Sequence, residues 1–417
     1  MVRLEEHKHS TEDKPIEILA APAKVYIHLA QHIGKPCAPL VKVGEEVLLG
    51  QGIGSVEAHV WAPVHSSVSG KVSAIIDWPH PVSGRGKVVV IENNGLDKLF
   101  PQLATRNPQP ENLSADQIRE IVRDAGIVGM GGASFPTHVK LKPSKPVDTL
   151  IINGAECEPY LTGDYRLMIE KTDEILKGIG LVERALGVKK VYIAIEDNKP
   201  AAIKIFQDRV QVLKSQYPQG GEKQLIKNVL KKEVPSGKLP FDIGVVVQNV
   251  GTVFAIYEAV YLGKPLYERI VTVTGSCLAN PKNLLVRIGT PIKELINYCA
   301  PLKEEPAKII IGGPMMGIAQ YTDEVPVIKS TTAVLLMSAQ EAKAREEIFC
   351  IRCGECVRHC PSGLMPCMIN LASEKELWPQ AKQYGALDCI ECGCCSYVCP
   401  ANRRLVQSIR RAKIECI

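Results

Sequence analysis

A cysteine motif that occurs twice near the end of the chain constrains the fold more than any other feature. The first copy has the spacing C-x2-C-x2-C-x3-C-P and consists of Cys350, Cys353, Cys356 and Cys360. The second copy begins 39 residues later, with the same spacing and proline, and consists of Cys389, Cys392, Cys395 and Cys399. Runs of this kind bind [4Fe–4S] clusters, and the fourth cysteine of each run ligates the other cluster.

The eight cysteines therefore divide into two crossed sets of ligands. We expect the first cluster to be held by Cys350, Cys353, Cys356 and Cys399. We expect the second cluster to be held by Cys389, Cys392, Cys395 and Cys360. The alternative is a pair of zinc sites, but zinc usually takes its four thiolates as two separated pairs. Cys367 and Cys394 fall outside the pattern and are interpreted as ordinary thiols.

Composition limits the class of protein. A chain of 417 residues needs about two to four domains. Its hydrophobic content of 46% excludes general disorder, and its formal net charge of +5 does not indicate a nucleic-acid binder. The odd total of 15 cysteines, without an apolar export segment at the N-terminus, argues against a disulfide scaffold. The most apolar stretch, Ile243–Leu262, contains Gln248, Asn249 and Glu258, so we expect no membrane-spanning helix.

Hydrophobic periodicity divides the chain into four regions. Residues 16–100 contain short β-branched runs between glycines, which predict an all-β unit. A polar linker over 108–117 ends at Ser114, the expected N-cap with Gln117 three residues later. From 115 to 265 the pattern alternates between strand and helix, including helices over 166–187 and 200–217, and predicts a largely parallel α/β sheet.

The region 266–335 returns to β character with one short helix, and residues 336–349 are predicted to form a helix that leads into the cysteine motifs. The expected domains are therefore 1–107, 108–265, 266–335 and 336–417. Within the first domain, residues 41–72 resemble a biotin- or lipoyl-carrier sandwich, but Val60 stands where a carrier has its lysine. We therefore expect an unmodified module.

A glycine-rich segment, GIVGMGGASFPTHVKL (126–141), follows the first predicted helix of the α/β region. Its backbone N–H groups could cradle a phosphate, although a glycine-rich turn is by itself a weak signal. Polar residues also follow three predicted strands, in INGAECEP (152–159), AIEDNKP (194–200) and VVVQNVGT (245–252). Because parallel strands bind ligands at their carboxyl ends, these segments predict one ligand site.

The segments GMGGASFPTHVKL, INGAECEP, GGEKQLI and VQNVGT resemble, in order and spacing, the flavin and NADH site of the NADH-binding flavoprotein subunit of respiratory complex I. The N-terminal region and the two cysteine motifs resemble more closely the RnfC family, the C subunits of Rnf electron transport complexes. This resemblance implies a multidomain α/β and α+β protein. It would comprise a barrel-sandwich hybrid module, a Rossmann-like α/β flavin/NADH domain, a small β-grasp (SLBB-like) module and an α-helical ferredoxin-type domain.

The resemblance also implies noncovalent FMN, with NAD(H) as substrate. The residues that it places at FMN or nicotinamide are Gly129, Gly131, Gly132, Phe135, Lys140, Asn153, Glu156, Glu158, Gly221, Glu222 and Asn249. Glu156 and Glu158 would position or polarise the nicotinamide and the flavin. The sequence departs from the complex I pattern at Met130, Ala155 and Lys223, each of which removes or inverts a charge.

The family resemblance implies a peripheral electron-transfer subunit of the ion-translocating ferredoxin:NAD⁺ oxidoreductase. Its expected partners are NAD(H) and the other subunits, including membrane subunits and a ferredoxin-type iron–sulfur subunit. We expect it at the cytoplasmic face of the plasma membrane. Two alternatives remain open from the sequence: a cobalamin reductase of the same architecture inside a microcompartment, and an electron-wire or scaffold subunit with a degenerate flavin site.

Overall fold

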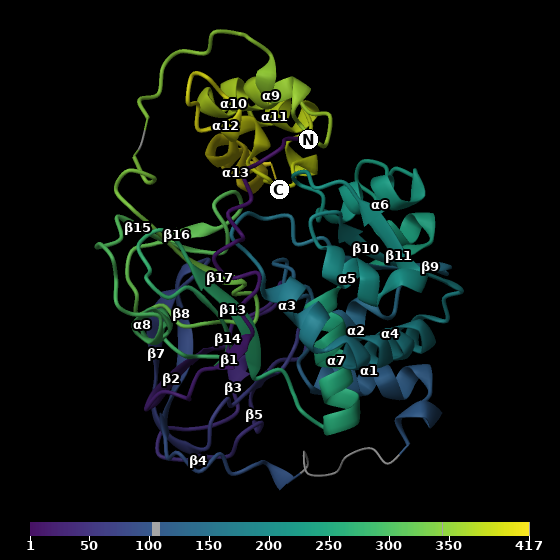
Figure 1. Ribbon diagram of the computed structural model, residues 1–417, viewed down its shortest axis with the longest axis vertical. Helices are drawn as coiled ribbons and strands as arrows, with labels where there is room; N and C mark the ends of the chain where they lie inside the picture. The colour runs from purple at the N-terminus through teal and green to yellow at the C-terminus, as the bar shows by residue number, and fades with distance from the viewer. Residues whose placement is uncertain (102–108, 344, 417) are drawn as a thin grey trace.

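The computed structural model of the chain describes residues 1–101, 109–343 and 345–416. Figure 1 shows the C-terminal helices at the top, an α/β region on the right and two β regions on the left. The expected boundary between residues 107 and 108 lies outside the described residues.

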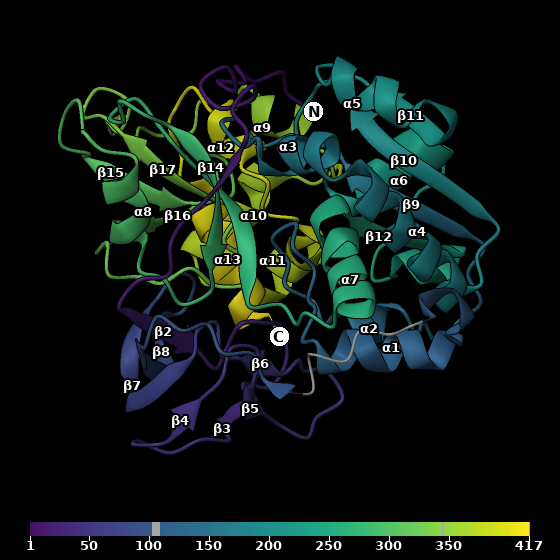
Figure 2. The same ribbon diagram turned by 60° about the horizontal axis from the view of Figure 1, so that its bottom comes forward.

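The N-terminal region is all-β, as the glycine-punctuated pattern predicted, and forms a sandwich of two antiparallel sheets (Figure 2). The larger sheet has the order β2-β8-β7-β4 and consists of β2 (Lys24–His28), β4 (Glu46–Val47), β7 (Gly70–His80) and β8 (Gly84–Asn93). The smaller sheet has the order β3-β5-β6 and consists of β3 (Ala38–Pro39), β5 (Gly52–Ser55) and β6 (Val64–His65). Because alternate residues of a strand point to one face, Val25, Ile27, Val89 and Ile91 are completely buried in one core.

The α/β region is built on a parallel four-stranded sheet of order β11-β10-β9-β12. Its strands are β9 (Thr149–Gly154), β10 (Lys190–Glu196), β11 (Val210–Leu213) and β12 (Val245–Asn249). The helices α1 (Ala115–Asp124), α4 (Thr172–Leu186) and α7 (Val250–Leu262) share one core with one face of the sheet. On the other face lies α6 (Glu222–Leu230). Both faces are covered, which explains why these strands are continuous apolar runs.

In this region one predicted helix end is confirmed, and two predicted helices differ from those observed. The hydroxyl of Ser114 accepts from the N–H of Gln117, and the Gln117 side chain accepts from the N–H of Ser114, so the predicted capping box of α1 is confirmed. The helix predicted over 166–187 is two helices, α3 (Gly163–Glu170) and α4, because Lys171 leaves the helical conformation with φ −131°.

The long helix predicted over 200–217 is wrong. The chain forms α5 (Pro200–Ile205) and the short helix η3 (Gln207–Arg209), and then β11. β-Branched residues suit a pleated strand, and Val210 and Val212 pair with β10 at the edge of the sheet. The remaining short helices of the region are η2 (Pro110–Asn112), α2 (Thr137–Lys140) and η4 (Pro240–Ile243).

The second β region is a six-stranded sheet of order β1-β14-β13-β17-β15-β16. Its strands are β1 (Ile16–Ile18), β13 (Glu268–Thr274), β14 (Lys282–Arg287), β15 (Lys308–Ile311), β16 (Ile318–Gln320) and β17 (Ala333–Met337), and α8 (Ile292–Tyr298) covers one face. β1 comes from the N-terminal segment, yet it pairs in parallel with β14 and not with the sandwich. The N-terminal segment therefore crosses from one module to another.

The C-terminal region is a small helical unit in which the cysteine motifs occupy equivalent places. Its elements are α9 (Glu355–Arg358), α10 (Pro366–Glu374), α11 (Trp378–Gln383), η5 (Ala386–Asp388), α12 (Cys394–Tyr397) and α13 (Leu405–Glu415). Each cysteine run contains a short helix, α9 or α12, and a longer helix, α10 or α13, begins soon after the proline. α10 and α13 share a core that contains Ile369 and Ile409.

The helix predicted over 336–349 is wrong, because residues 336 and 337 end β17 and no helix lies within 338–343 or 345–349. The carboxylate of Glu341 accepts from the N–H of Ser338, which closes a turn at the start of the segment. Within the described parts of the chain, none of the helices has the length and apolar character needed to cross a membrane.

Candidate functional site

The glycine-rich segment folds into a tight loop in front of α2. The N–H of Gly129 donates to the carbonyl of Phe135 at 2.9 Å, and the N–H of Ser134 donates back to Gly129 at 3.2 Å. Gly132 has φ +115° and open space where a side chain would begin, while a Cβ on Gly131 would lie 3.4 Å from the Asn249 side chain. The loop is therefore an open backbone cradle beside the end of β12.

Asn249 places the N-terminus of α7 against this cradle. Its side-chain oxygen accepts from the N–H groups of Gly251 and Thr252 at 2.9 and 3.3 Å, which makes it the N-cap of the helix. Its side-chain nitrogen donates to Asp164 at 2.7 Å, so the orientation of the amide is fixed at both ends. A glycine loop and a helix N-terminus together form an anion-binding surface.

Two further segments close the same side of the site. Lys140, at the end of α2, forms an ion pair of 2.5 Å with Glu222, at the start of α6. Asn153, at the end of β9, donates to the carbonyl of Gly220 at 2.9 Å and thereby holds the segment that contains Gly221. The structure thus brings the expected residues of four separate segments to one edge of the sheet.

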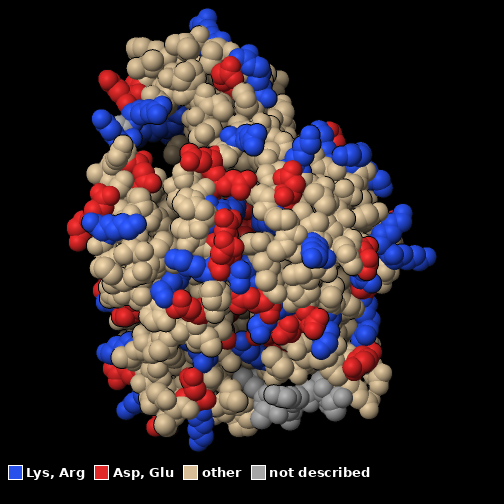
Figure 3. Space-filling view, viewed as in Figure 1, with Lys and Arg blue, Asp and Glu red and all other residues tan. Residues whose placement is uncertain are grey.

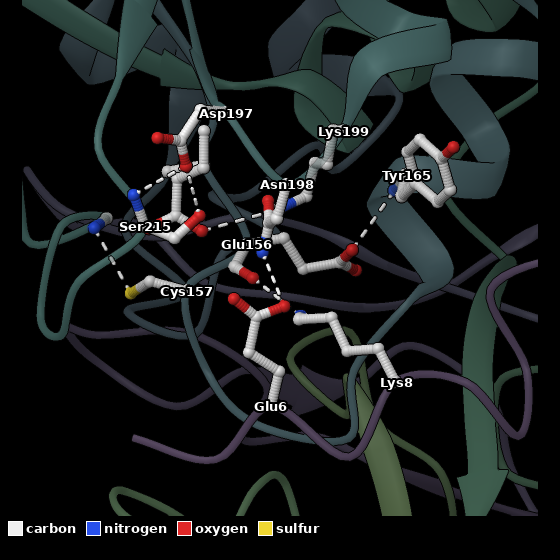
Figure 4. A network of polar contacts seen from close by, with 12 residues as sticks. Glu6, Lys8, Glu156, Cys157, Tyr165, Asp197, Asn198, Lys199 and Ser215 are labelled. Atoms are coloured by element: carbon white, nitrogen blue, oxygen red, sulfur yellow. Dashed lines mark hydrogen bonds and ion pairs between the residues drawn. The ribbon is translucent and has the colours of Figure 1, made fainter. Parts of the chain in front are cut away.

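The two expected catalytic carboxylates point in different directions. The Glu156 carboxylate accepts from the N–H groups of Asp164 and Tyr165 at 2.7 and 3.2 Å, at the start of α3 (Figure 4). The Glu158 carboxylate accepts from the N–H groups of Met315 and Met316 at 2.7 and 3.0 Å, in the turn between β15 and β16. Burial raises the pKa of Glu158, and these hydrogen bonds oppose the rise.

Sequence reasoning gave no role to several polar groups of the site, although Gln248 lies in VVVQNVGT, one of the polar segments expected at the site. Ser134 Oγ, Thr137 Oγ1 and Gln248 Nε2 are buried and find no hydrogen-bond partner among the described residues. Two of them lie inside the glycine-rich segment, so their motif position was an available signal. Burial, followed by the charge of Glu156, raises the pKa of Asp164 to about 7, and no spacing pattern marks this residue. Unpartnered donors around an open cradle fit the phosphate and hydroxyl groups of FMN.

Met130 shows how the chain accommodates the loss of a charge at one of the positions that depart from the complex I pattern. Its side chain is 8% exposed and packs in the domain core, and its N–H donates to the hydroxyl of Thr252 at 2.9 Å. The backbone of the cradle is therefore held by α7 without a charge at this position.

The second set of cysteines surrounds one cavity. Its lining includes Cys360, Cys389, Cys392 and Cys395, together with apolar residues such as Ile390 and Ile409. Across the described residues, no three His, Cys, Asp or Glu side chains converge as they would on a single metal ion. Zinc needs four thiolates within about 2.3 Å of one point, whereas a [4Fe–4S] cluster takes one thiolate at each iron. Thiols spread around a cavity therefore fit the cluster.

Of the four cysteines expected to hold the first cluster, only two lie in one packed group. Cys356 and Cys399 pack together beside Cys395, whereas Cys350 and Cys353 are exposed on the segment before α9. Cys394 is completely buried and directs its thiol to the carbonyl of Tyr217 at 3.9 Å, as an ordinary thiol would.

A buried apolar cluster joins the two parts of the site. Tyr217, Cys392 and Cys394 are buried in it, and Cys157 and Ile390 pack against them. Cys157 also contacts the segment that Asn153 holds at the carboxyl edge of the parallel sheet, because its sulfur accepts from the N–H of Gly220 at 3.1 Å. The second cysteine set therefore lies directly against the α/β domain.

Family models match four parts of the chain. They are the RnfC barrel sandwich hybrid domain over residues 2–96, the Nuo51 FMN-binding domain over 122–258, the SLBB domain over 270–319 and the 4Fe-4S dicluster domain over 342–400. The expected fold class is confirmed in each of its four parts.

Solved structures with a similar fold include the NAD⁺-reducing [NiFe]-hydrogenase in its H₂-reduced state. The match has a TM-score of 0.51 at 17% identity and covers 75% of this chain and 64% of that one. At this identity the likeness concerns the fold alone.

Three curated relatives are similar over most of their length. The C subunit of the proton-translocating ferredoxin:NAD(+) oxidoreductase complex of Clostridium ljungdahlii is 48% identical over 99% of this chain and 93% of its own. The C subunit of the Na(+)-translocating complex of Acetobacterium woodii is 46% identical, covering 98% and 95%. The C subunit of the ion-translocating oxidoreductase complex of Rhodobacter capsulatus is 44% identical, covering 98% and 81%. The chain therefore belongs to the RnfC family, the C subunits of ion-translocating ferredoxin:NAD(+) oxidoreductase, or Rnf, complexes.

Proposed function

We propose that this chain is the subunit of a ferredoxin:NAD⁺ oxidoreductase complex that exchanges hydride with NAD(H) and single electrons with its partners. The observation that carries the proposal is the buried contact between the glycine-loop site and the cysteine-lined cavity, through Cys157, Tyr217 and Cys392. The relatives named as C subunits of such complexes support the assignment.

FMN would be held noncovalently at the carboxyl edge of the parallel sheet. The residues that would hold it are Gly129, Gly131, Gly132, Phe135, Lys140, Asn153, Glu156, Glu158, Gly221, Glu222 and Asn249. FMN supplies the conversion between a hydride and two single electrons, which nicotinamide and iron–sulfur clusters cannot make between themselves. The open glycine loop and the N-terminus of α7 would hold the phosphate, and Glu156 and Glu158 would position the nicotinamide.

The second cysteine set would hold the cluster nearer to the flavin. Cys392 and Cys395 are each 7% exposed, whereas Cys350 and Cys353 of the first set lie at the surface. The first set would therefore hold the cluster that exchanges electrons with other subunits, which include membrane subunits and a ferredoxin-type iron–sulfur subunit. This subunit would act at the cytoplasmic face of the membrane. Its domains would have the limits expected from the sequence, 1–107, 108–265, 266–335 and 336–417.

Anaerobic reconstitution with FMN, iron and sulfide tests this function directly. We expect one FMN and about eight iron atoms per chain, as two [4Fe–4S] clusters require. NADH should then bleach first the flavin and then the cluster absorption. A protein that retains both clusters but binds no FMN would instead be an electron wire, and an iron content of about four would contradict the two-cluster assignment.

A further inference from the structure

An N-terminal arm, residues 1–14, crosses the carboxyl edge of the parallel sheet, where FMN is proposed to bind, on its way to β1 (Figures 1 and 2). Val2 and Tyr217 exchange backbone hydrogen bonds of 2.9 and 2.8 Å, and Glu6 accepts from the side chain of Asn198 at 2.8 Å. In Figure 3, acidic side chains gather along the face where this arm runs, and Glu5 is 84% exposed. The carboxylates of the arm are exposed or half-buried, whereas one cation of the arm is buried.

That cation is Lys8, which is 6% exposed and points into the sheet edge (Figure 4). Its ammonium donates to the backbone carbonyls of Glu156, Glu158 and Leu161 at 2.8, 3.1 and 2.5 Å. Three acceptors satisfy all three N–H groups of a lysine. Within the described chain no carboxylate forms an ion pair with it, and burial lowers the pKa of Lys8. Because all three partners are backbone carbonyls, Lys8 fixes the backbone conformation of the segment Glu156–Leu161.

The segment that Lys8 holds is the one that carries both expected catalytic carboxylates. Glu156 and Tyr160 have positive φ values of 45° and 70°, a conformation that costs energy in residues other than glycine. Such a turn persists only when its surroundings fix it. Lys8 binds three carbonyls of this turn, while the carboxylate of Glu156 binds the start of α3 and that of Glu158 binds the β15–β16 turn.

We propose that Lys8 is a positioning residue for the nicotinamide site, which acts by fixing the turn Glu156–Leu161 through its three carbonyls. This inference rests on the proposed function for the identity of the ligand. The N-terminal arm would thereby help to form a site whose residue Glu156 is 148 residues from Lys8 along the chain. The arm precedes the sandwich in the chain and leads to β1 of the six-stranded sheet, so a segment outside the α/β domain would shape the dinucleotide site.

The test compares the full-length holoprotein with Lys8→Met, Lys8→Arg and Lys14→Met variants. Lys14 is the matched control, because it lies on the same arm and donates to the carbonyl of Pro281 at 2.8 Å, in the six-stranded sheet region. Initial rates of NADH oxidation with ferricyanide give KM and kcat separately. We expect Lys8→Met to raise KM for NADH about tenfold or more at unchanged FMN and iron content, since small misplacements of positioning groups are costly. Lys8→Arg should recover most of the loss, and Lys14→Met should leave KM unchanged.

Hydrogen exchange of the peptide that contains Glu156–Leu161 provides a readout that needs no NADH. Lys8→Met should exchange faster there, and Lys14→Met and Lys8→Arg should not. The inference is overturned if Lys8→Met changes neither KM nor exchange, or if Lys14→Met changes both equally. Failure of the proposed function would give a different result. The unchanged protein would then neither bind FMN nor oxidise NADH, regardless of how fast the Glu156–Leu161 peptide exchanges hydrogen.

Discussion

Individual residues decide which ligands this chain holds, and their roles were predictable to different degrees. The glycine loop, Asn249 and the cysteine runs were predicted from motifs, because each motif is a local spacing. Asp164 and the direction of Glu158 were not, because they depend on contacts between residues 85 and 157 positions apart, which no spacing records. The sequence therefore predicts where a site lies but does not show which groups fix its geometry.

Asp164 predicts a pH-dependent stability. Its pKa is about 7 in the folded protein, above its ordinary value of 3.8, so the folded state binds a proton more tightly than the unfolded state between these values. The stability that this proton contributes is present at low pH and is lost as the pH rises towards 7. Asp164→Asn mimics the protonated form and still accepts from Asn249. We expect its melting-temperature advantage over the unchanged protein to grow from pH 5 to pH 7 and then remain constant; a difference independent of pH would contradict this.

The crossed pairing of the cysteines is testable with single substitutions. Cys360 lies in the first motif but lines the cavity of the second set. Cys360→Ala and Cys389→Ala are therefore expected to lose the same cluster, and Cys399→Ala and Cys350→Ala the other. Each variant should retain about four iron atoms, with matching electron paramagnetic resonance spectra within a pair. If Cys360→Ala matches Cys350→Ala, the clusters are not crossed.

Helices and strands were predicted well where both faces of the element are buried and poorly where one face is open. β9, β10, β12 and α7 are continuous apolar segments in the core, and all were expected. β11 was mistaken for helix because it is a short edge strand in which Val212 is 46% exposed. The segment after β17 was mistaken for helix because its charged residues favour a helix in isolation, while most of its described residues after Ser338 are exposed and do not pack in a core.

The contact between α4 and α7 predicts opposite effects at two glycines of one helix. A Cβ on Gly178 would lie 2.4 Å from the Val253 carbonyl oxygen, so Gly178→Ala must push the helices apart. Gly180 has nothing within 4 Å of the same position. We expect Gly178→Ala to lower the free energy of unfolding by about 1–3 kcal/mol. Gly180→Ala should raise it by up to about 1 kcal/mol through helix propensity. Denaturant unfolding of both variants measures the difference, and equal effects would refute the close packing.

At the scale of the whole molecule, buried polar groups tie the modules together. The Lys329 ammonium, from the loop before β17, donates to carbonyls of Pro63 in the sandwich and Gly126 in the α/β domain, at 2.7 and 2.6 Å. Asn283 of β14 donates to the carbonyl of Thr11 in the arm and accepts from Thr162 and Thr272. The four modules could be predicted from hydrophobic periodicity and family resemblance, but the ties between modules could not, because each is a single pair of groups far apart in sequence.

Asn283→Ala tests whether the modules unfold as one. Asn283 is completely buried, and its removal takes one hydrogen-bond partner from groups of the arm, the α/β domain and the sheet, at about 1–3 kcal/mol for each group left unsatisfied. We expect a lower melting temperature and separate calorimetric transitions where the unchanged protein has one. Asn280, which is exposed and donates to the carbonyl of Ala300, is the control and should change little when replaced by alanine. A single transition at an unchanged temperature would contradict the prediction.

The crossing of the arm to Tyr217, Asn198 and β14 has a consequence for synthesis on the ribosome. The arm emerges before any of these partners, and the last of them follows roughly 270 residues later. At about 5–20 residues per second, the arm waits about ten seconds to a minute without its partners. The sandwich can fold during this wait, since its strands are close in sequence. Lys8 can fix the turn Glu156–Leu161 once that turn has emerged, 148 to 153 residues after Lys8, whereas the pairing of the arm with β14 must come later.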